Sequence, residues 1–220
     1  MATLQLGILV SGSGTNLQTI LDATADGRLD ARVRIVISNR PDAAAIGRAS
    51  RAGIASRVIS HKAFDGRRSF ELALVHALRE AGAEWIVLAG FMRVLTPAFL
   101  DAFPMRVINI HPALLPSFPG MDAQGQALAS GVRVAGCTVH LVDSGTDTGP
   151  IIAQSVVPVL QNDTRDSLAA RILQREHQLL FEVLRWISQD RLTVYAATNQ
   201  QRARVQLDDV NPWFGLDPMP

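Results

Sequence analysis

Short apolar runs alternate with segments of helical periodicity along the first half of the chain. The first run, residues 4–10, closes on the turn Ser-Gly-Ser-Gly, and the next segment places Leu17, Ile20 and Leu21 at helical spacing. Near-continuous apolar strands joined by helices are typical of a parallel sheet covered on both faces. The pattern predicts an α/β, Rossmann-like unit with a mostly parallel central sheet flanked by helices. The expected strands are residues 4–10, 32–38, 55–59, 85–89 and 107–111, and the expected helices begin at 16, 41, 67 and 97.

This alternation ends after His111. Residues 112–135 carry prolines at 112, 116 and 119, so we expect a long loop with one short helix near 123–129. Loops of this length in compact domains are usually functional. Strands at 137–143 and 151–158, a long helix at 166–189 and a last strand at 192–196 complete one predicted domain, residues 1–196. The polar residues 197–220 are expected to form a poorly ordered tail.

The composition argues against several classes of protein. The 21 basic and 20 acidic residues leave a formal charge of +1, which gives no electrostatic attraction to nucleic acid or to an anionic membrane. Cys137 is the only cysteine, so neither an internal disulfide nor a multi-cysteine metal site is expected. The N-terminus lacks a basic targeting segment, and no apolar run reaches membrane-spanning length. These features predict a cytoplasmic protein.

The turn at residues 11–16 joins the first strand to the first helix. Its small residues let backbone N–H groups close on an anion at the helix N-terminus, where the helix dipole favours negative charge. A dinucleotide-binding turn needs a third glycine where this chain has Leu17, although Arg40 could hold a 2′-phosphate. A nucleoside-triphosphate loop needs a lysine that is missing here. A monophosphate fits best, and a tight turn that binds nothing is the alternative.

Asn109 and His111 stand two residues apart on a predicted strand, so their side chains point to the same side. Pro112 ends that strand at the edge where open parallel sheets bind ligands. An amide beside an imidazole can stabilise an oxyanion and move a proton, which are the two needs of acyl transfer. Alternatively, Asn109 caps the chain reversal and His111 binds a backbone carbonyl.

Acidic residues are the candidates to assist His111. Asp143 and Asp147 flank a turn that follows a strand containing His140, and a carboxylate near His111 would stabilise its imidazolium. Turn aspartates also often cap their own backbone. The histidines lack the spacing of a zinc site, so no metal is expected.

Glu176 interrupts the apolar stripe of the predicted helix 166–189, between Ile172 and Leu179. A carboxylate that faces the core needs a partner. Arg175 is one candidate for this partner, and a substrate amine or hydroxyl is the other.

Five segments of the chain together resemble the phosphoribosylglycinamide formyltransferases, folate-dependent enzymes of purine biosynthesis. The resemblance covers about residues 4–195. Two of the motifs, NIHP and DTGPII, also occur in formyltetrahydrofolate hydrolase and methionyl-tRNA formyltransferase. The motif SGSGTNLQ narrows the choice, because it resembles the part of this family that binds the ribose phosphate. The five segments are SGSGTNLQTIL, LAGFMRVL, NIHPALLPSFPG, GCTVHLVDSGTDTGPIIAQ and REH.

The resemblance implies formyl transfer from the co-substrate 10-formyltetrahydrofolate to the amine of glycinamide ribonucleotide, without a metal. It implies that Asn109 and protonated His111 stabilise the tetrahedral oxyanion while Asp147 keeps His111 charged. The ribonucleotide-binding residues that it implies are Gly14, Thr15, Asn16, Leu173, Gln174, Arg175 and Glu176. The implied folate-binding residues are Arg67, Met92, Arg93, Val94, Leu95, Asn109, Asp143, Ser144, Gly145, Thr146 and Asp147.

One position departs from this family. Asp122 stands where the family usually has a histidine, and a second acid near His111 would favour the imidazolium, so activity is expected to survive. Formyltetrahydrofolate hydrolase is the alternative enzyme, but that family carries an N-terminal regulatory domain, whereas here the strand pattern begins at Leu4. A nicotinamide-dinucleotide-binding protein is a weaker alternative. The partners expected are small-molecule substrates, and either a monomer or a homodimer fits.

Overall fold

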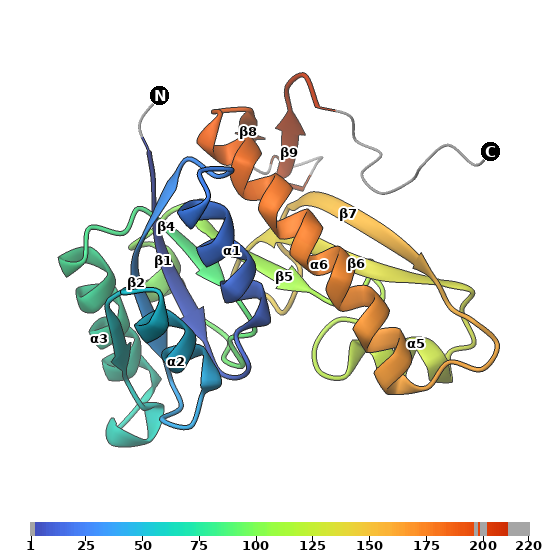
Figure 1. Ribbon diagram of the computed structural model, residues 1–220, viewed down its shortest axis with the longest axis horizontal. Coiled ribbons are helices and arrows are strands. Elements are labelled where there is room, and N and C mark those ends of the chain that lie inside the picture. The colour runs from blue at the N-terminus through green and yellow to red at the C-terminus, as the bar shows by residue number, and fades with distance from the viewer. Residues whose placement is uncertain (1–2, 196–197, 199–201, 211–220) are drawn as a thin grey trace. The chain divides into compact units, whose positions relative to one another are not determined.

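The computed structural model describes residues 3–195, 198 and 202–210. The chain divides into two compact units, residues 1–109 and 110–220, whose elements are labelled in Figure 1. Strand β5 (Val107–His111) crosses this boundary, because Asn109 ends the first unit and Ile110 begins the second.

The first unit is built on parallel strands in the order β3-β2-β1-β4-β5. Right-handed crossovers in this order place α1 and α2 on one face of the sheet and α3 on the other. Accordingly, α1 contacts α2, beside which it lies in Figure 1, and α3 contacts α4. The elements before β5 are β1 (Leu4–Val10), α1 (Thr15–Ala25), β2 (Ala31–Ser38), α2 (Ala44–Arg51), β3 (Ser56–Val58), the 3-10 helix η1 (His61–Ala63), α3 (Arg67–Glu80), β4 (Trp85–Leu88) and α4 (Pro97–Leu100).

Helices on both faces bury the central strands of this unit. Leu6, Ile8 and Leu9 of β1 are completely buried, as are Leu17 of α1 and Leu74 of α3. Burial of one such side chain stabilises a fold by roughly 1.5–3 kcal/mol, before the entropy cost of ordering it. The interiors of these strands are therefore apolar.

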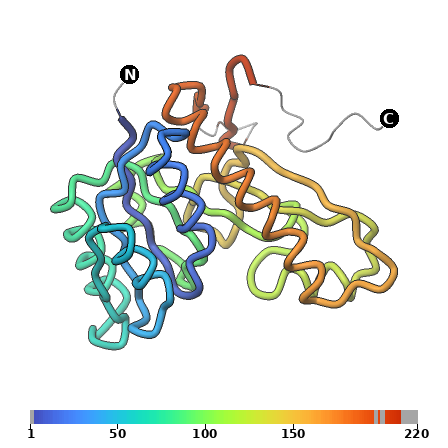
Figure 2. Tube along the Cα trace, in the orientation of Figure 1, coloured from blue at the N-terminus to red at the C-terminus, as the bar shows by residue number. Residues whose placement is uncertain are grey.

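In the second unit, β6 (Val134–Leu141) and β7 (Ile151–Pro158) pair antiparallel. The long helix α6 (Arg165–Ser188) packs on both strands and contacts α5 (Ala123–Ala129) (Figure 1). A capping box of Thr164 and Ser167 closes the N-terminus of α6. Figure 2 follows the loop that leaves β5 at His111 and leads into α5.

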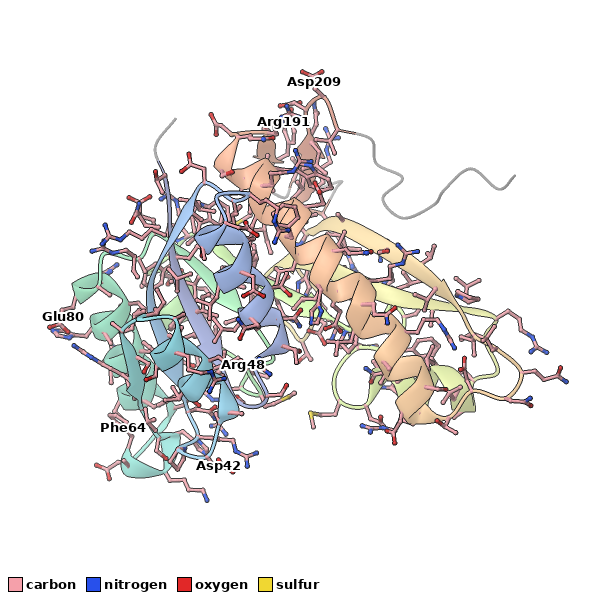
Figure 3. The ribbon with its side chains drawn as sticks, in the orientation of Figure 1. Asp42, Arg48, Phe64, Glu80, Arg191 and Asp209 are labelled. Atoms are coloured by element: carbon pink, nitrogen blue, oxygen red, sulfur yellow. The ribbon has the colours of Figure 1, made fainter. Side chains whose placement is uncertain are left out.

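A two-stranded hairpin of β8 (Leu192–Tyr195) and β9 (Arg204–Leu207) follows α6. The Arg191 carbonyl accepts a hydrogen bond from the Asp208 N–H at 3.0 Å, and the Arg191 guanidinium donates to the Asp209 carbonyl at 3.3 Å (Figure 3). The prediction of a poorly ordered tail is therefore wrong for β9, which gains its order by pairing with β8. The rest of the predicted tail, apart from residues 198, 202–203 and 208–210, lies outside the described residues.

The α/β fold with a mostly parallel sheet is confirmed, and the predicted bounds of β5, β7 and α5 match the structure. Two predicted starts are wrong by three residues. Strand β6 begins at Val134 rather than Cys137, because the antiparallel ladder with β7 continues as far as Pro158. Helix α2 begins at Ala44, since residues 41–42 form a turn instead. In the part of the chain that the structure describes, no helix combines the length and apolar character needed to cross a membrane.

Candidate active site

His111 ends β5 with 5% of its surface exposed, and its imidazole is held from both sides. Nδ1 lies 3.3 Å from Oδ2 of Asp147, and Nε2 lies 2.9 Å from the carbonyl oxygen of Phe118. A neutral imidazole has only one N–H, whereas the imidazolium has two and can donate to both of these acceptors. The geometry therefore matches a cationic ring at the end of the strand.

The Asp147 carboxylate interacts with two imidazoles and one backbone amide. Besides His111, it accepts a hydrogen bond from the Gly120 N–H at 2.8 Å, and His140 Nε2 lies 3.7 Å from its other oxygen. Burial alone would raise the pKa of Asp147, but the contact with His140, the Gly120 amide and the nearby His111 together lower it below its ordinary value. Asp147 thus remains a carboxylate beside His111.

His140 is a member of this cluster that the sequence analysis did not assign to the site. It is 2% exposed on β6, and its Nδ1 lies 2.8 Å from the Leu141 carbonyl oxygen while Nε2 faces Asp147. The available sequence signal was its place on the strand directly before the turn that carries Asp147. That spacing alone did not indicate that the two side chains meet.

Asn109 is two residues before His111 on β5 and is partly buried. It pairs with Leu88 of β4 in the sheet of the first unit. Alternation along a strand points its side chain to the same side as His111. The predicted combination of an amide and an imidazole at the end of one strand therefore agrees with the local backbone.

Asp143 has a different environment from Asp147. Its carboxylate accepts hydrogen bonds from the Gly145 N–H at 3.0 Å and from the Thr148 hydroxyl at 2.7 Å. Asp143 therefore stabilises the turn that contains Ser144, Gly145 and Thr146, as the capping alternative expected. Asp147 directly follows these three residues.

Asp122, at the position that departs from the family, is paired with Arg165 of α6. It precedes α5 in a left-handed conformation, φ 55°, and its carboxylate accepts a 2.5 Å hydrogen bond from the Arg165 guanidinium. This hydrogen bond lowers the pKa of Asp122 below its ordinary value. The pair links the start of α5 to the start of α6.

We expect Asp122→His to change kcat/KM by less than about tenfold, because the altered side chain belongs to an exposed ion pair. Histidine, like aspartate, tolerates a left-handed backbone better than most residues. Steady-state kinetics of both substrates provide the measurement. Asp122→Asn, which removes only the charge, is the matched control. A gain of several orders of magnitude on introducing histidine would identify the parent chain as an impaired relative.

In the first unit, the loop at residues 11–16 is held against α2. Gly14 caps α1 at φ 72°, and the Ala45 N–H donates to the Gly12 carbonyl at 3.2 Å. The Arg48 guanidinium donates to the Ser13 carbonyl at 2.8 Å; Figure 3 labels this side chain on α2. The loop therefore keeps the N–H groups at the start of α1, at Thr15 and Asn16, in a fixed arrangement.

Gly14→Ala is expected to lower the free energy of unfolding by about 1–3 kcal/mol, because alanine disfavours the left-handed backbone. Its added Cβ would also lie 2.6 Å from the Ala45 Cβ. Chemical denaturation measures this effect. We further expect the KM for the ribonucleotide to rise while the KM for the folate barely moves.

Gly12→Ala is the matched control for Gly14→Ala, since an added Cβ at Gly12 meets nothing within 4 Å. It should leave both the stability and the two KM values near those of the parent. An equal rise of both KM values in Gly14→Ala would indicate that the loop supports the fold rather than one ligand.

The predicted folate segment, residues 92–95, presents apolar side chains to solvent. Met92 is 65% exposed and Val94 is 46% exposed, whereas Leu95 is buried and Arg93 is partly buried. Exposed apolar groups beside backbone donors suit a flat ring. Arg67, the remaining folate residue of this unit, is exposed at the first position of α3.

In the second unit, Leu173, Gln174 and Arg175 lie on α6 with Glu176, which is 7% exposed as the apolar stripe predicted. Arg175 donates a hydrogen bond to the Gln178 side chain at 3.1 Å.

Cys137 is completely buried near the same helix. Burial and the nearby Glu176 carboxylate both raise the pKa of its thiol. A thiol that resists ionisation is a poor nucleophile, which agrees with the prediction that Cys137 belongs to the core.

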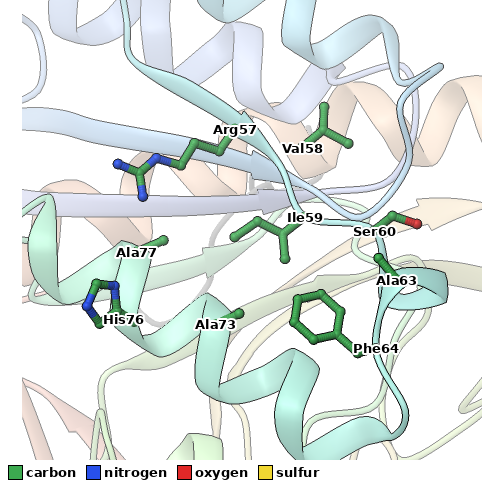
Figure 4. Close-up of a pocket in the computed structure, with 9 residues that line it drawn as sticks. All are labelled: Arg57, Val58, Ile59, Ser60, Ala63, Phe64, Ala73, His76 and Ala77. Atoms are coloured by element: carbon green, nitrogen blue, oxygen red, sulfur yellow. The ribbon is translucent and has the colours of Figure 1, made fainter.

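An open hollow of about 520 Å³ lies elsewhere in the first unit, between the end of β3, η1 and α3. Figure 4 shows Arg57 and His76 at one end and Phe64 at the other. None of its lining residues belongs to the predicted catalytic or substrate-binding set. Most of its lining side chains are apolar, and Arg57, Ser60 and His76 are its polar members.

Comparisons with known proteins agree with the motifs. Residues 4–184 match the formyl transferase family. A phosphoribosylglycinamide formyltransferase from Escherichia coli is 40% identical over 86% of this chain and 89% of its own length. The trifunctional purine biosynthetic protein adenosine-3 of Drosophila melanogaster is 48% identical over 79% of this chain, which spans only 13% of that longer protein.

A solved structure shares the fold as well as the sequence. Glycinamide ribonucleotide transformylase 1 from Symbiobacterium toebii superposes with a TM-score of 0.90 at 46% identity. The match covers 94% of this chain and 95% of that one.

Proposed function

The chain belongs to the formyl transferase family, and we propose that it transfers the formyl group of 10-formyltetrahydrofolate to the amine of glycinamide ribonucleotide. The products are formylglycinamide ribonucleotide and tetrahydrofolate, in purine biosynthesis. The similarity to a single-function formyltransferase over nearly its whole length supports this choice among formyl-transferring enzymes.

The pairing of His111 with Asp147 is the observation that carries the proposal. A buried imidazole that lies 3.3 Å from a carboxylate can, as the imidazolium, stabilise negative charge on a neighbouring oxygen. Asn109, on the same side of β5, supplies an amide N–H for the same purpose. These are the groups that a formyl-transfer transition state requires.

In the proposed reaction, the amine nitrogen of the ribonucleotide attacks the formyl carbon that is bonded to N10 of the folate. The carbonyl π electrons move to oxygen. Asn109 donates a hydrogen bond to the resulting oxyanion, and so does the His111 Nε2–H, which exchanges the Phe118 carbonyl for the substrate oxygen. When the oxyanion collapses, the bond from the formyl carbon to N10 breaks, and the electron pair stays on N10. A proton passes from the attacking amine to N10 through His111 or water, so the imidazolium is regenerated and no metal is required.

Each substrate is assigned separate segments of the chain. We assign the ribonucleotide phosphate to the backbone of Gly14, Thr15 and Asn16, and the rest of that substrate to residues 173–176 with Glu176. We assign the folate to Arg67, to residues 92–95, to Asn109 and to residues 143–147. The exposed Met92 and Val94 support the folate assignment, since the flat face of an aromatic ring would cover them.

The test mixes the protein with 10-formyltetrahydrofolate and glycinamide ribonucleotide, and follows deformylated folate by absorbance. Turnover that requires both substrates, with formylglycinamide ribonucleotide as product, supports the proposal. Equal turnover with the folate alone would instead identify a hydrolase, in which water replaces the amine.

Arg40 bears on the nicotinamide alternative. Its guanidinium donates to both carboxylate oxygens of Asp42, at 3.1 and 2.7 Å, and is therefore occupied by a partner of its own. A titration of NADPH fluorescence tests this alternative directly. We propose that the protein acts in the cytoplasm on small-molecule substrates alone, as a monomer or homodimer, which light scattering distinguishes.

A further inference from the structure

Ser11, at the start of the loop assigned to the phosphate, is bonded to the segment assigned to the folate. Its side chain is buried, with 3% of the residue exposed. The Met92 N–H donates to Ser11 Oγ at 2.9 Å, and the Ser11 N–H donates to the Gly90 carbonyl at 3.1 Å. Ser11, which directly follows β1, therefore forms hydrogen bonds with two backbone groups of the loop after β4.

The orientation of the Ser11 hydroxyl is fixed by its other partner. A backbone N–H can only donate, so Ser11 Oγ accepts from Met92, and its own proton is donated to Asn39 Oδ1 at 2.6 Å. Asn39 is itself 4% exposed, and its amide nitrogen lies 3.4 Å from Nδ1 of His61. The Ser11 hydroxyl is therefore fixed as the donor to Asn39 and the acceptor from Met92.

The segment that Ser11 holds has no regular secondary structure of its own between β4 and α4. At its far end, Thr96 donates its N–H to the buried Glu71 carboxylate at 3.0 Å and also donates its hydroxyl to Glu71. Residues 92–95 are thus held between a Ser11 anchor and a Glu71 anchor. Between them, Met92 and Val94 remain exposed to a ligand.

We propose that Ser11 is a positioning residue for the folate, although it lies in the phosphate loop. Its hydroxyl fixes the Met92 amide and so presets the backbone donors and the apolar side chains of residues 92–95. A preset loop loses less conformational entropy when the ligand binds. The inference rests on the proposed function, which assigns residues 92–95 to the folate.

Steady-state kinetics of Ser11→Ala test the inference, with Ser13→Ala as the matched control because Ser13 is exposed in the same loop. We expect Ser11→Ala to raise the KM for 10-formyltetrahydrofolate by about tenfold, the effect of one lost hydrogen bond of about 1.4 kcal/mol. The KM for the ribonucleotide should change less than about threefold. Ser11→Thr, which keeps the hydroxyl, should restore most of the loss, and Ser13→Ala should not raise the KM for 10-formyltetrahydrofolate.

Amide hydrogen exchange of Met92 in the unliganded protein gives a second measurement that does not depend on turnover. It should accelerate by about tenfold in Ser11→Ala and remain unchanged in Ser13→Ala. If Ser11→Ala does not fold, Ser11→Cys, a weaker acceptor of similar size, should shift both measurements in the same direction.

The inference is overturned if Met92 exchange is unchanged, or if both KM values rise equally. Suppose that Met92 exchange accelerates in Ser11→Ala but that the parent protein does not turn over the two substrates. This outcome would reject the proposed function and confirm that Ser11 anchors the Met92 amide. The two failures are therefore distinguishable.

Discussion

Replacing His111 with alanine is expected to lower kcat by about 10²–10⁴-fold. The alanine variant loses both the hydrogen bond to the oxyanion and the group that can carry the proton to N10. The KM values should change little, because His111 is assigned neither the phosphate nor the pterin ring. Steady-state kinetics with both substrates measure these changes. Asn109→Ala should lower kcat by about 10²-fold.

Because His111 is buried, its replacement also needs a test of folding. His111→Asn keeps a polar side chain and should fold like the parent protein while losing comparable activity. His76→Ala, at an exposed histidine of α3, is the matched control and should retain full activity. Near-normal turnover in a folded His111→Ala protein would contradict the mechanism. If neither His111 variant folds, the result would support the alternative in which His111 only binds a backbone carbonyl.

Strand ends that are marked by a proline could be predicted from the sequence. Pro112 follows β5 and Pro158 closes β7, and proline ends a ladder of backbone hydrogen bonds. Elements that depend on a partner were predicted less well. Strand β9 alternates exposed and partly buried residues and exists because it pairs with β8, so its short polar sequence gave little indication of a strand.

The site shows the same division. The carboxyl ends of the strands could be predicted to carry the chemistry, and His111 and Asp147 do lie together. The contact of His140 with Asp147 depends on how the turn after β6 folds back, which periodicity does not encode. The sequence analysis assigned no partner to Asp122, and the contact of its carboxylate with Arg165, 43 residues further along the chain, has no signal in the periodicity.

Replacing Asp147 with asparagine is expected to lower kcat by about 10²–10³-fold, although the side chain keeps its size. The amide carries no charge, so it stabilises the His111 imidazolium less than the carboxylate does. The KM for the ribonucleotide should change little. Steady-state kinetics of Asp147→Asn measure the loss, and Asp143→Asn is the matched control in the same turn. Comparable losses of kcat in the two variants would show that the turn matters rather than the charge beside His111.

The same substitution should change the acid stability of the protein in a defined direction. The folded protein lowers the pKa of Asp147, so the unfolded chain binds this proton more tightly, and the carboxylate stabilises the fold above its unfolded-state pKa of about 3.9. That contribution is lost as the pH falls through the lower folded-state pKa. The free energy of unfolding of the parent minus that of Asp147→Asn should therefore be largest near neutral pH and decrease below about pH 4. Denaturant titrations from neutral to acidic pH measure this difference, and a difference that grows as the pH falls would contradict the lowered pKa of Asp147 in the folded protein.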